Sequence, residues 1–271
     1  MEIPSAVYSN KSKTLPLLVL FLGVLVLVWW MNTPEGLLGK ADAIGYTVCH
    51  RIDLRSFHLG ERQLPLCARC SGMYLGAVLG LSYQWIIGRR CAGTPPWTVL
   101  ALLGVLIFAF VIDGLNSFIS LIPGISTLYQ PGNTTRLLTG TGMGLVIAAA
   151  LYPAFNATVW RQANPQPALR NLIVFSMLIG LAVGLDILVL TEMPIVLYPM
   201  ALISAGGVIG LLTIVYSMVW VMVFRAENRY NRVQDMIIPL VGGLTVAFLQ
   251  IILLDLVRYG LTGTWEGFHL G

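Results

Sequence analysis

Long apolar runs recur along the chain and alternate with short polar segments. A helix needs about 20 apolar residues to cross the hydrocarbon layer of a bilayer, and it satisfies its own backbone hydrogen bonds there. The pattern therefore predicts an all-α protein, a polytopic bundle of about seven transmembrane helices. The predicted helices cover about residues 15–31, 70–88, 96–114, 137–155, 170–190, 197–224 and 234–257.

The first apolar run resembles a secretory signal peptide, because Lys11 and Lys13 precede it. The run is long for a signal peptide, however, and Trp29 and Trp30 close it where a cleavage site would have small residues. We therefore expect a retained first transmembrane helix.

The composition supports a membrane location. Hydrophobic residues make up 57% of the 271 residues and charged residues only 10%, whereas soluble proteins have about 25% charged residues. The net charge of +4 comes from basic residues at helix ends rather than from a basic patch, so nucleic acid is not an expected partner. The expected partners are the lipid bilayer, other membrane-protein subunits, and a small anionic or lipid ligand.

The distribution of Lys and Arg sets the expected orientation. With the N-terminus in the cytoplasm, nine basic residues lie on the cytoplasmic side and seven on the other. Four of those seven lie in one segment, residues 48–76, and without them the count is nine to three. We therefore place this Cys/His segment on the extracytoplasmic side, together with the 113–136 connection, the turn at Thr191 and the C-terminal tail.

The Cys/His segment contains three of the four cysteines and two of the three histidines, in the run CHRIDLRSFHLGERQLPLCARC. Cys67 and Cys70 form a CxxC pair, whose sulfurs can share one metal ion. Cys49 and one histidine complete a tetrahedral Cys3His set, so the segment predicts a zinc or iron site. His58 is the better fourth ligand, because adjacent residues such as Cys49 and His50 usually point apart. His50 is the alternative if the backbone turns there.

The same cysteines fit other functions. The start of a helix favours thiolate over thiol, so Cys67 and Cys70 would also serve as the reactive pair of a thiol-redox membrane enzyme, with Cys49 as the resolving partner. On an oxidising face they fit a structural disulfide. A non-enzymatic accessory or scaffold subunit of a larger membrane complex is a third alternative. Cys91 falls on the opposite face, where we expect a free thiol.

A second group of polar residues lies at the same membrane depth: Asp113, Asn116, Asn133 and Arg136. A carboxylate near the end of an apolar helix needs a partner, so we expect an Asp113–Arg136 ion pair. The pair either clamps two helices together or, with the asparagine donors, binds an anion, a cofactor or a lipid head group.

Two more acids, Asp186 and Asp255, lie near helix ends on this face. They would cap their helices at the interface, with Arg258 one turn from Asp255, or line a cation or proton path.

The run CHRIDLRSF…LPLCARCSGMYLG resembles a family of prokaryotic membrane proteins known as domain of unknown function 2085. The resemblance covers about residues 46–150 and continues in Asp113-Gly114 and in Asn133-Thr-Thr-Arg136-Leu-Leu-Thr-Gly140, while Asn116 departs from the Gln common in the family. It implies a prokaryotic plasma membrane and no particular activity, so whether the chain is an enzyme stays open. We expect three parts: 1–45, a helix and connecting segment; 46–155, the Cys/His segment and three helices; and 156–271, three further helices and a tail.

Overall fold

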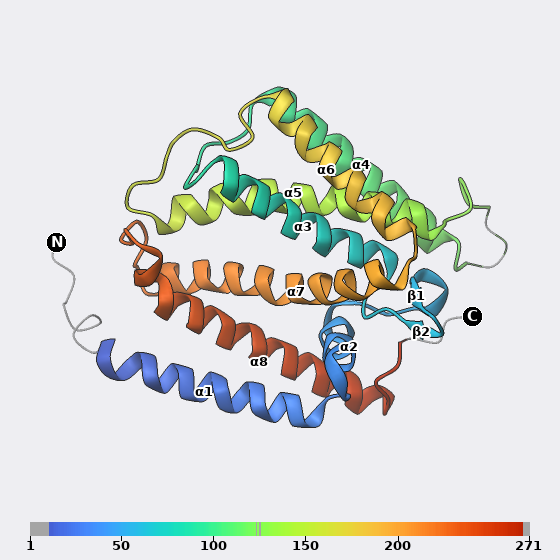
Figure 1. Cartoon of the computed structure of the whole chain (residues 1–271), viewed down its shortest axis with the longest axis horizontal. Coiled ribbons are helices and arrows are strands. Elements are labelled where there is room, and N and C mark those ends of the chain that lie inside the picture. Colours follow the sequence, from blue (N-terminus) through green and yellow to red (C-terminus); the bar gives the residue numbers. More distant parts are fainter. Residues whose placement is uncertain (1–10, 123, 125, 268–271) are drawn as a thin grey trace.

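The computed structural model describes residues 11–122, 124 and 126–267. Helices make up most of this part of the chain (Figure 1). They are α1 (Lys11–Asn32), α2 (Gly36–Val48), α3 (Ala68–Ile87), α4 (Trp97–Ile119), α5 (Asn133–Val159), α6 (Leu172–Leu190), α7 (Pro194–Val223) and α8 (Ile237–Thr262), with short 3-10 helices at Asp53–Arg55 and Val233–Met236. Two short strands, β1 (His58–Leu59) and β2 (Arg62–Gln63), form an antiparallel hairpin.

Each of the seven predicted long helices is present, as α1 and α3 to α8, which confirms the all-α polytopic fold. Six of these helices, all except α3, are long and apolar enough to cross a membrane. α3 has 20 residues but includes Arg69, Ser82 and Gln84, and it packs along α5. The protein is therefore an integral membrane protein in which α3 packs along α5, one of the membrane-crossing helices.

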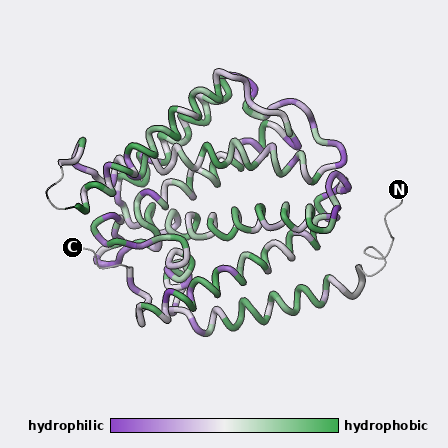
Figure 2. Tube along the Cα trace, turned by 180° about the vertical axis from the view of Figure 1, so that it is seen from behind, coloured by the Kyte–Doolittle hydropathy of each residue, from purple (hydrophilic) through white to green (hydrophobic). Residues whose placement is uncertain are grey.

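The long helices stack in successive layers (Figure 1). α4 and α6 lie outermost on one side, followed by α3 and α5, then α7, α8 and finally α1. Hydrophobic residues run along the helices, and hydrophilic residues gather at the two ends of the bundle (Figure 2). This distribution is the one that a bilayer requires, because side chains along the middle of the bundle face hydrocarbon.

α3 and α5 approach each other so closely that glycine is required between them. A Cβ atom on Gly76 would lie 2.4 Å from the carbonyl oxygen of Thr141, and one on Gly144 would lie 2.2 Å from that of Met73. Small residues allow such backbone contact between membrane helices. Glycines therefore mark the contact between these two helices, whereas Gly206 and Gly210 have nothing within 4 Å of the corresponding position.

The loops predicted to share a face do lie together. Arg55 donates a hydrogen bond to the carbonyl of Ser117 at the end of α4, and Arg51 donates one to the carbonyl of Trp265 after α8. β1, β2 and α2 lie at this same end of the bundle (Figure 1). At the other end, the loops after α3 and α5 pair at Cys91 and Asn164.

Two elements of this end were not predicted. Residues 36–48, expected as a connecting segment, form α2, which packs against α7 and α8. Residues 58–63, expected as a surface or re-entrant loop, form the hairpin, with His58 opposite Gln63. Neither has a long apolar run, so hydropathy alone could not reveal them.

Candidate metal centre

Three cysteines from two segments converge at the start of α3. Cys49 follows the last residue of α2, Cys67 immediately precedes α3, and Cys70 lies in the first turn of α3. Their three sulfur atoms all lie within 4.8 Å of one another. Cys49 and Cys67 are buried, and Cys70 is half-buried. The sequence predicted this grouping from the CxxC pair and the upstream CysHis.

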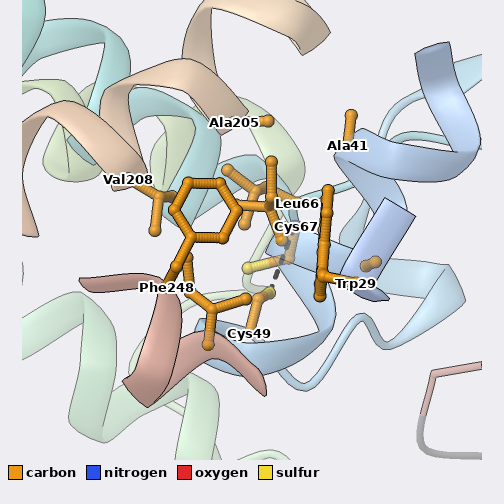
Figure 3. Packing of buried hydrophobic residues seen from close by; sticks show 11 residues of the cluster. Trp29, Ala41, Cys49, Leu66, Cys67, Ala205, Val208 and Phe248 are labelled. Carbon is orange, nitrogen blue, oxygen red and sulfur yellow. Dashed lines mark hydrogen bonds between the residues drawn. The ribbon is translucent and has the colours of Figure 1, made fainter. Parts of the chain in front are cut away.

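A glycine contact holds the two segments together. A Cβ atom on Gly45 would lie 2.0 Å from the carbonyl oxygen of Pro65, so the last turn of α2 rests directly on the backbone that leads into α3. Cys49 and Cys67 then lie within a shared apolar cluster with Trp29 and Phe248 (Figure 3). Apolar surroundings keep water away from the sulfur atoms and strengthen any electrostatic contact that they make.

Backbone amides point at one of the sulfurs. The N–H groups of Arg51 and Cys67 donate to Cys49 Sγ, at 3.4 and 3.3 Å, and the second contact is the dashed line in Figure 3. Arg51 reaches this position with a φ of 50°, in the left-handed region that non-glycine residues rarely adopt. Such donors stabilise the charged form of a sulfur, which is the form that binds metal.

The thiols also act on one another. Hydrogen bonds with Cys49 and Cys70 outweigh burial and hold the pKa of Cys67 well below its usual range, and a contact with His50 adds to this effect. The hydrogen bond to Cys67 is the largest cause that raises the pKa of Cys49 to about 12. The arrangement therefore favours one thiolate, at Cys67, whose charge is supported by its neighbours' protons. All four cysteines are free thiols.

The two histidines of the Cys/His segment have different partners. His50 Nδ1 lies 4.0 Å from Cys49 Sγ, whereas His58 Nε2 lies 2.8 Å from a carboxylate oxygen of Asp53. Although the sequence favours His58 as the fourth ligand, His50 is the histidine whose ring lies beside the sulfur of Cys49. Whether either histidine binds a metal stays a prediction.

Charged partners that the sequence did not reveal anchor the segment. Asp42 on α2 accepts hydrogen bonds from Arg51 at 3.0 Å and from Arg62 at 2.7 Å. Arg258 on α8 donates to the carbonyl oxygens of Tyr46 and Cys49, the latter at 2.6 Å. These contacts fix the Cys/His segment to α2 and α8, so Arg51, Arg62 and Arg258 have structural partners at this end of the bundle.

Asp113 does not pair with Arg136 as predicted. Its carboxylate pairs with Arg69, and it also accepts hydrogen bonds from the Tyr129 hydroxyl at 2.6 Å and from Thr139 at 3.2 Å. Both carboxylate oxygens of Asp113 therefore have hydrogen-bond donors other than Arg136. Arg136 instead donates to the side chain of Asn133 at 3.1 Å.

The two predicted asparagines have structural partners. Asn116 donates to the carbonyl of Tyr129 at 2.9 Å and accepts from the backbone N–H of Leu128 at 2.8 Å, so it shapes the loop after α4. Asn133 donates to the carbonyl of Ser56 at 3.1 Å and so ties α5 to the Cys/His segment. Their role in binding a ligand stays a prediction.

The two remaining acids are bound across helices rather than serving as caps. Asp186 on α6 accepts a hydrogen bond from Thr141 on α5 at 2.6 Å. Asp255 on α8 accepts one from the indole N–H of Trp29 on α1 at 3.0 Å. Each residue is 4% exposed, so both side chains are covered by neighbouring parts of the protein.

The part of the chain that contains the three cysteines is similar to known sequences. The model of a family described as "Predicted membrane protein (DUF2085)" matches residues 49–150. An uncharacterized protein of Methanothermobacter thermautotrophicus is 31% identical over 101 residues, which cover 37% of this chain and 81% of that protein. An uncharacterized protein of Methanocaldococcus jannaschii is 23% identical over 122 residues, 44% of this chain and 71% of that protein. No solved structure matches the chain.

Proposed function

We propose, on the premise that this chain belongs to the DUF2085 family of predicted membrane proteins, that it is a metalloprotein with a zinc or iron centre at its extracytoplasmic end. Cys49, Cys67 and Cys70 supply three ligands, and His50 supplies the fourth. The observation that supports this proposal is the convergence of three sulfurs within 4.8 Å from two separate segments.

The spacing suits a tetrahedral ion. Zinc–sulfur bonds of about 2.3 Å place two sulfurs of such a site about 3.8 Å apart. The cysteines therefore need to move little to enclose the ion, and His50 Nδ1 is 4.0 Å from Cys49 Sγ. His50 is exposed while Cys49 and Cys67 are buried, so the histidine is the ligand that water or a substrate can replace. The metal would first hold the Cys/His segment in place. Any catalysis would take place at the coordination position that His50 occupies.

A thiol-redox enzyme is the second candidate. The lowered pKa of Cys67 and the partial exposure of Cys70 favour a reactive CxxC pair. Oxidation would join the two sulfurs and release two electrons and two protons, so the reaction also needs a membrane oxidant such as a quinone. An accessory-subunit role has weaker support, because lipid covers the exposed apolar surface of the long helices as well as a partner would.

Metal content and thiol state separate these candidates. We expect protein purified in mild detergent without chelators to contain about one equivalent of zinc or iron, measured by elemental analysis. Alkylation of the native protein should leave the three clustered cysteines protected until a chelator is added. A metal content below about a tenth of an equivalent would contradict the proposal. Thiols that alkylate only after reduction would then favour the redox candidate.

Next to the cysteines, three arginines form a second component that we propose to bind an anion. Arg55 and Arg69 donate to the carbonyl and hydroxyl oxygens of Ser117, at 3.0 and 2.9 Å. Arg136 reaches the same region through Asn133, which donates to the carbonyl of Ser56. Among the described residues, Asp113 is the one carboxylate that forms an ion pair with any of these three guanidinium groups, and its partner is Arg69. The positive charge left over suits a phosphate or carboxylate.

The hydrogen bonding of these three arginines also supports an anion site. The Nε atoms of Arg69 and Arg136 are buried and have no partner among the described residues. Repulsion from Arg69 is, after burial, the next cause that lowers the pKa of Arg55, so the guanidinium groups are close enough to repel. A bound anion would relieve this repulsion. Because Cys67 also acts electrostatically on Arg55 and Arg136, the anion would lie beside the metal centre.

Binding of inorganic phosphate tests this component. We expect phosphate to raise the melting temperature of the wild-type protein and to have a weaker effect on Arg136→Gln, since one of three converging charges is lost. Arg170→Gln, an exposed arginine at the other end of the bundle, is the control and should respond as the wild type does. A short-chain phosphatidic acid distinguishes a lipid head group from free phosphate. Equal responses of all three proteins to both probes would contradict the anion site.

A further inference from the structure

A cavity of about 480 Å³ lies between α1 and α8, apart from the cysteine cluster. Three aromatic residues contribute to its wall: Trp29 of α1, Tyr259 of α8 and Trp265 after α8. Asn32 and Thr33 at the end of α1 also line it, and so does Asp255. It therefore combines one carboxylate with an aromatic wall, near the end of the bundle where the Cys/His segment lies.

Asp255 lacks a complete set of partners. Its Oδ2 accepts from the indole N–H of Trp29, but its Oδ1 is buried and has no hydrogen-bond partner among the described residues. A charged carboxylate leaves Oδ1 without a donor. A protonated one leaves its O–H without an acceptor. In either state a group beyond the described residues is needed to complete the hydrogen bonding, because an unpaired buried polar atom is costly.

The nearest basic side chains point to other partners. Arg258, one turn along α8, donates to the carbonyls of Tyr46 and Cys49 and stacks on the ring of Tyr46 at 3.9 Å. Lys40 of α2 donates to the carbonyl and hydroxyl of Thr33, at 2.9 and 3.0 Å. Arg258 acts electrostatically on Asp255, but it does not supply a donor to Oδ1, which has no partner among the described residues.

We propose that this cavity binds a primary ammonium group. Such a group supplies both features that the cavity calls for: N–H donors for the unpaired carboxylate oxygen, and a positive charge that the faces of Trp29, Tyr259 and Trp265 attract. Oδ1 is covered by protein, so contact requires rotation of the carboxylate about its Cβ–Cγ bond, a torsion with a broad energy well. The ligand is the head group of an aminophospholipid or a soluble alkylamine, since the two share this chemistry.

A matched pair of variants tests the proposal. Asp255→Asn removes the charge while keeping the shape. Asp186→Asn removes an equally buried carboxylate that lies outside the cavity and is bound by Thr141. The probes are n-butylammonium chloride and its neutral counterpart n-butanol, with the melting temperature as the readout. Nanodiscs of phosphatidylethanolamine and of phosphatidylglycerol, followed by native mass spectrometry, test for a lipid source. Metal content is measured in parallel to show that the cysteine centre is intact.

We expect n-butylammonium, but not n-butanol, to stabilise the wild type and Asp186→Asn, with its affinity for Asp255→Asn at least about tenfold weaker. Retention of phosphatidylethanolamine by the wild type and not by Asp255→Asn would support the same site and identify a lipid as the source. Equal stabilisation by n-butanol, an equal response of Asp255→Asn, or no response to either ammonium probe would overturn the proposal. None of these outcomes depends on the metal, so the two proposals fail separately.

Discussion

Replacing Cys67 with serine should remove the proposed metal and destabilise the end of the bundle where the Cys/His segment lies. Cys67 contacts the other two sulfurs of the cluster, and its backbone N–H donates to Cys49 Sγ. Serine keeps the size of the side chain but is a poor ligand for zinc or iron. We expect the metal content of Cys67→Ser to fall from about one equivalent to below about a tenth, and the melting temperature to fall with it, because metal-binding free energy contributes to folding.

The fourth cysteine provides the control for this prediction. Cys91 is also buried, but it lies at the other end of the bundle, where Asn164 donates to its sulfur. Cys91→Ser should therefore keep the metal. If it loses as much metal as Cys67→Ser, or if both keep it, the three-cysteine centre is wrong.

A second pair of variants identifies the fourth ligand. His50→Ala should retain metal that a chelator removes more readily, because one ligand is lost and the sulfurs remain. His58→Ala should behave as the wild type, since its ring is bound to Asp53. The opposite result would assign the ligand to His58 and would mean that the hairpin rearranges around the metal.

The long helices could be predicted from the sequence because each is an apolar run, and membrane helices need no more specific signal than length and hydropathy. α2 could not. It is short, and Lys40 and Asp42 interrupt its apolar residues, yet both are buried by contacts with Thr33 and Arg51. A charged residue is interpreted as exposed unless its partner is known, and these partners become visible only when α1, α2 and the Cys/His segment are placed together.

Within the candidate metal centre, too, some features could be predicted from the sequence and others could not. The three cysteines could be grouped from spacing alone, because CxxC brings two sulfurs together on one helical turn. The positions of His50 beside Cys49 and of His58 beside Asp53 depend on how the segment folds, which the spacing of the residues does not reveal. The partner of Asp113 could not be predicted either. Arg69 of α3 pairs with the carboxylate and Arg136 of α5 donates to Asn133, a distinction that depends on how α3, α4 and α5 pack together.

The ion pair between Arg69 and Asp113 should be the most sensitive electrostatic contact of the fold. Asp113 has 1% of its side chain exposed and Arg69 has 19%. Removing one member of a buried pair leaves an unpaired charge and typically costs about 3–5 kcal/mol. We expect Arg69→Met to be more destabilising than Asp113→Asn. The methionine variant leaves a buried carboxylate, whereas the asparagine variant leaves an arginine that still donates to Ser117.

The double variant distinguishes a pair from two separate contributions. Because Arg69→Met with Asp113→Asn leaves neither charge unpaired, its loss of unfolding free energy should be smaller than the sum of the two single losses, by about 0.5–3 kcal/mol. Unfolding in a mixed-micelle denaturant series, followed by circular dichroism, measures all three variants. Asp53→Asn is the matched control: it alters a carboxylate contact, with His58, at the same end of the bundle, but the Asp53 side chain is 71% exposed. Its effect should stay within about 1 kcal/mol. If the Arg69 and Asp113 losses simply add, the two residues act independently, and Tyr129 and Thr139 alone hold the carboxylate in place.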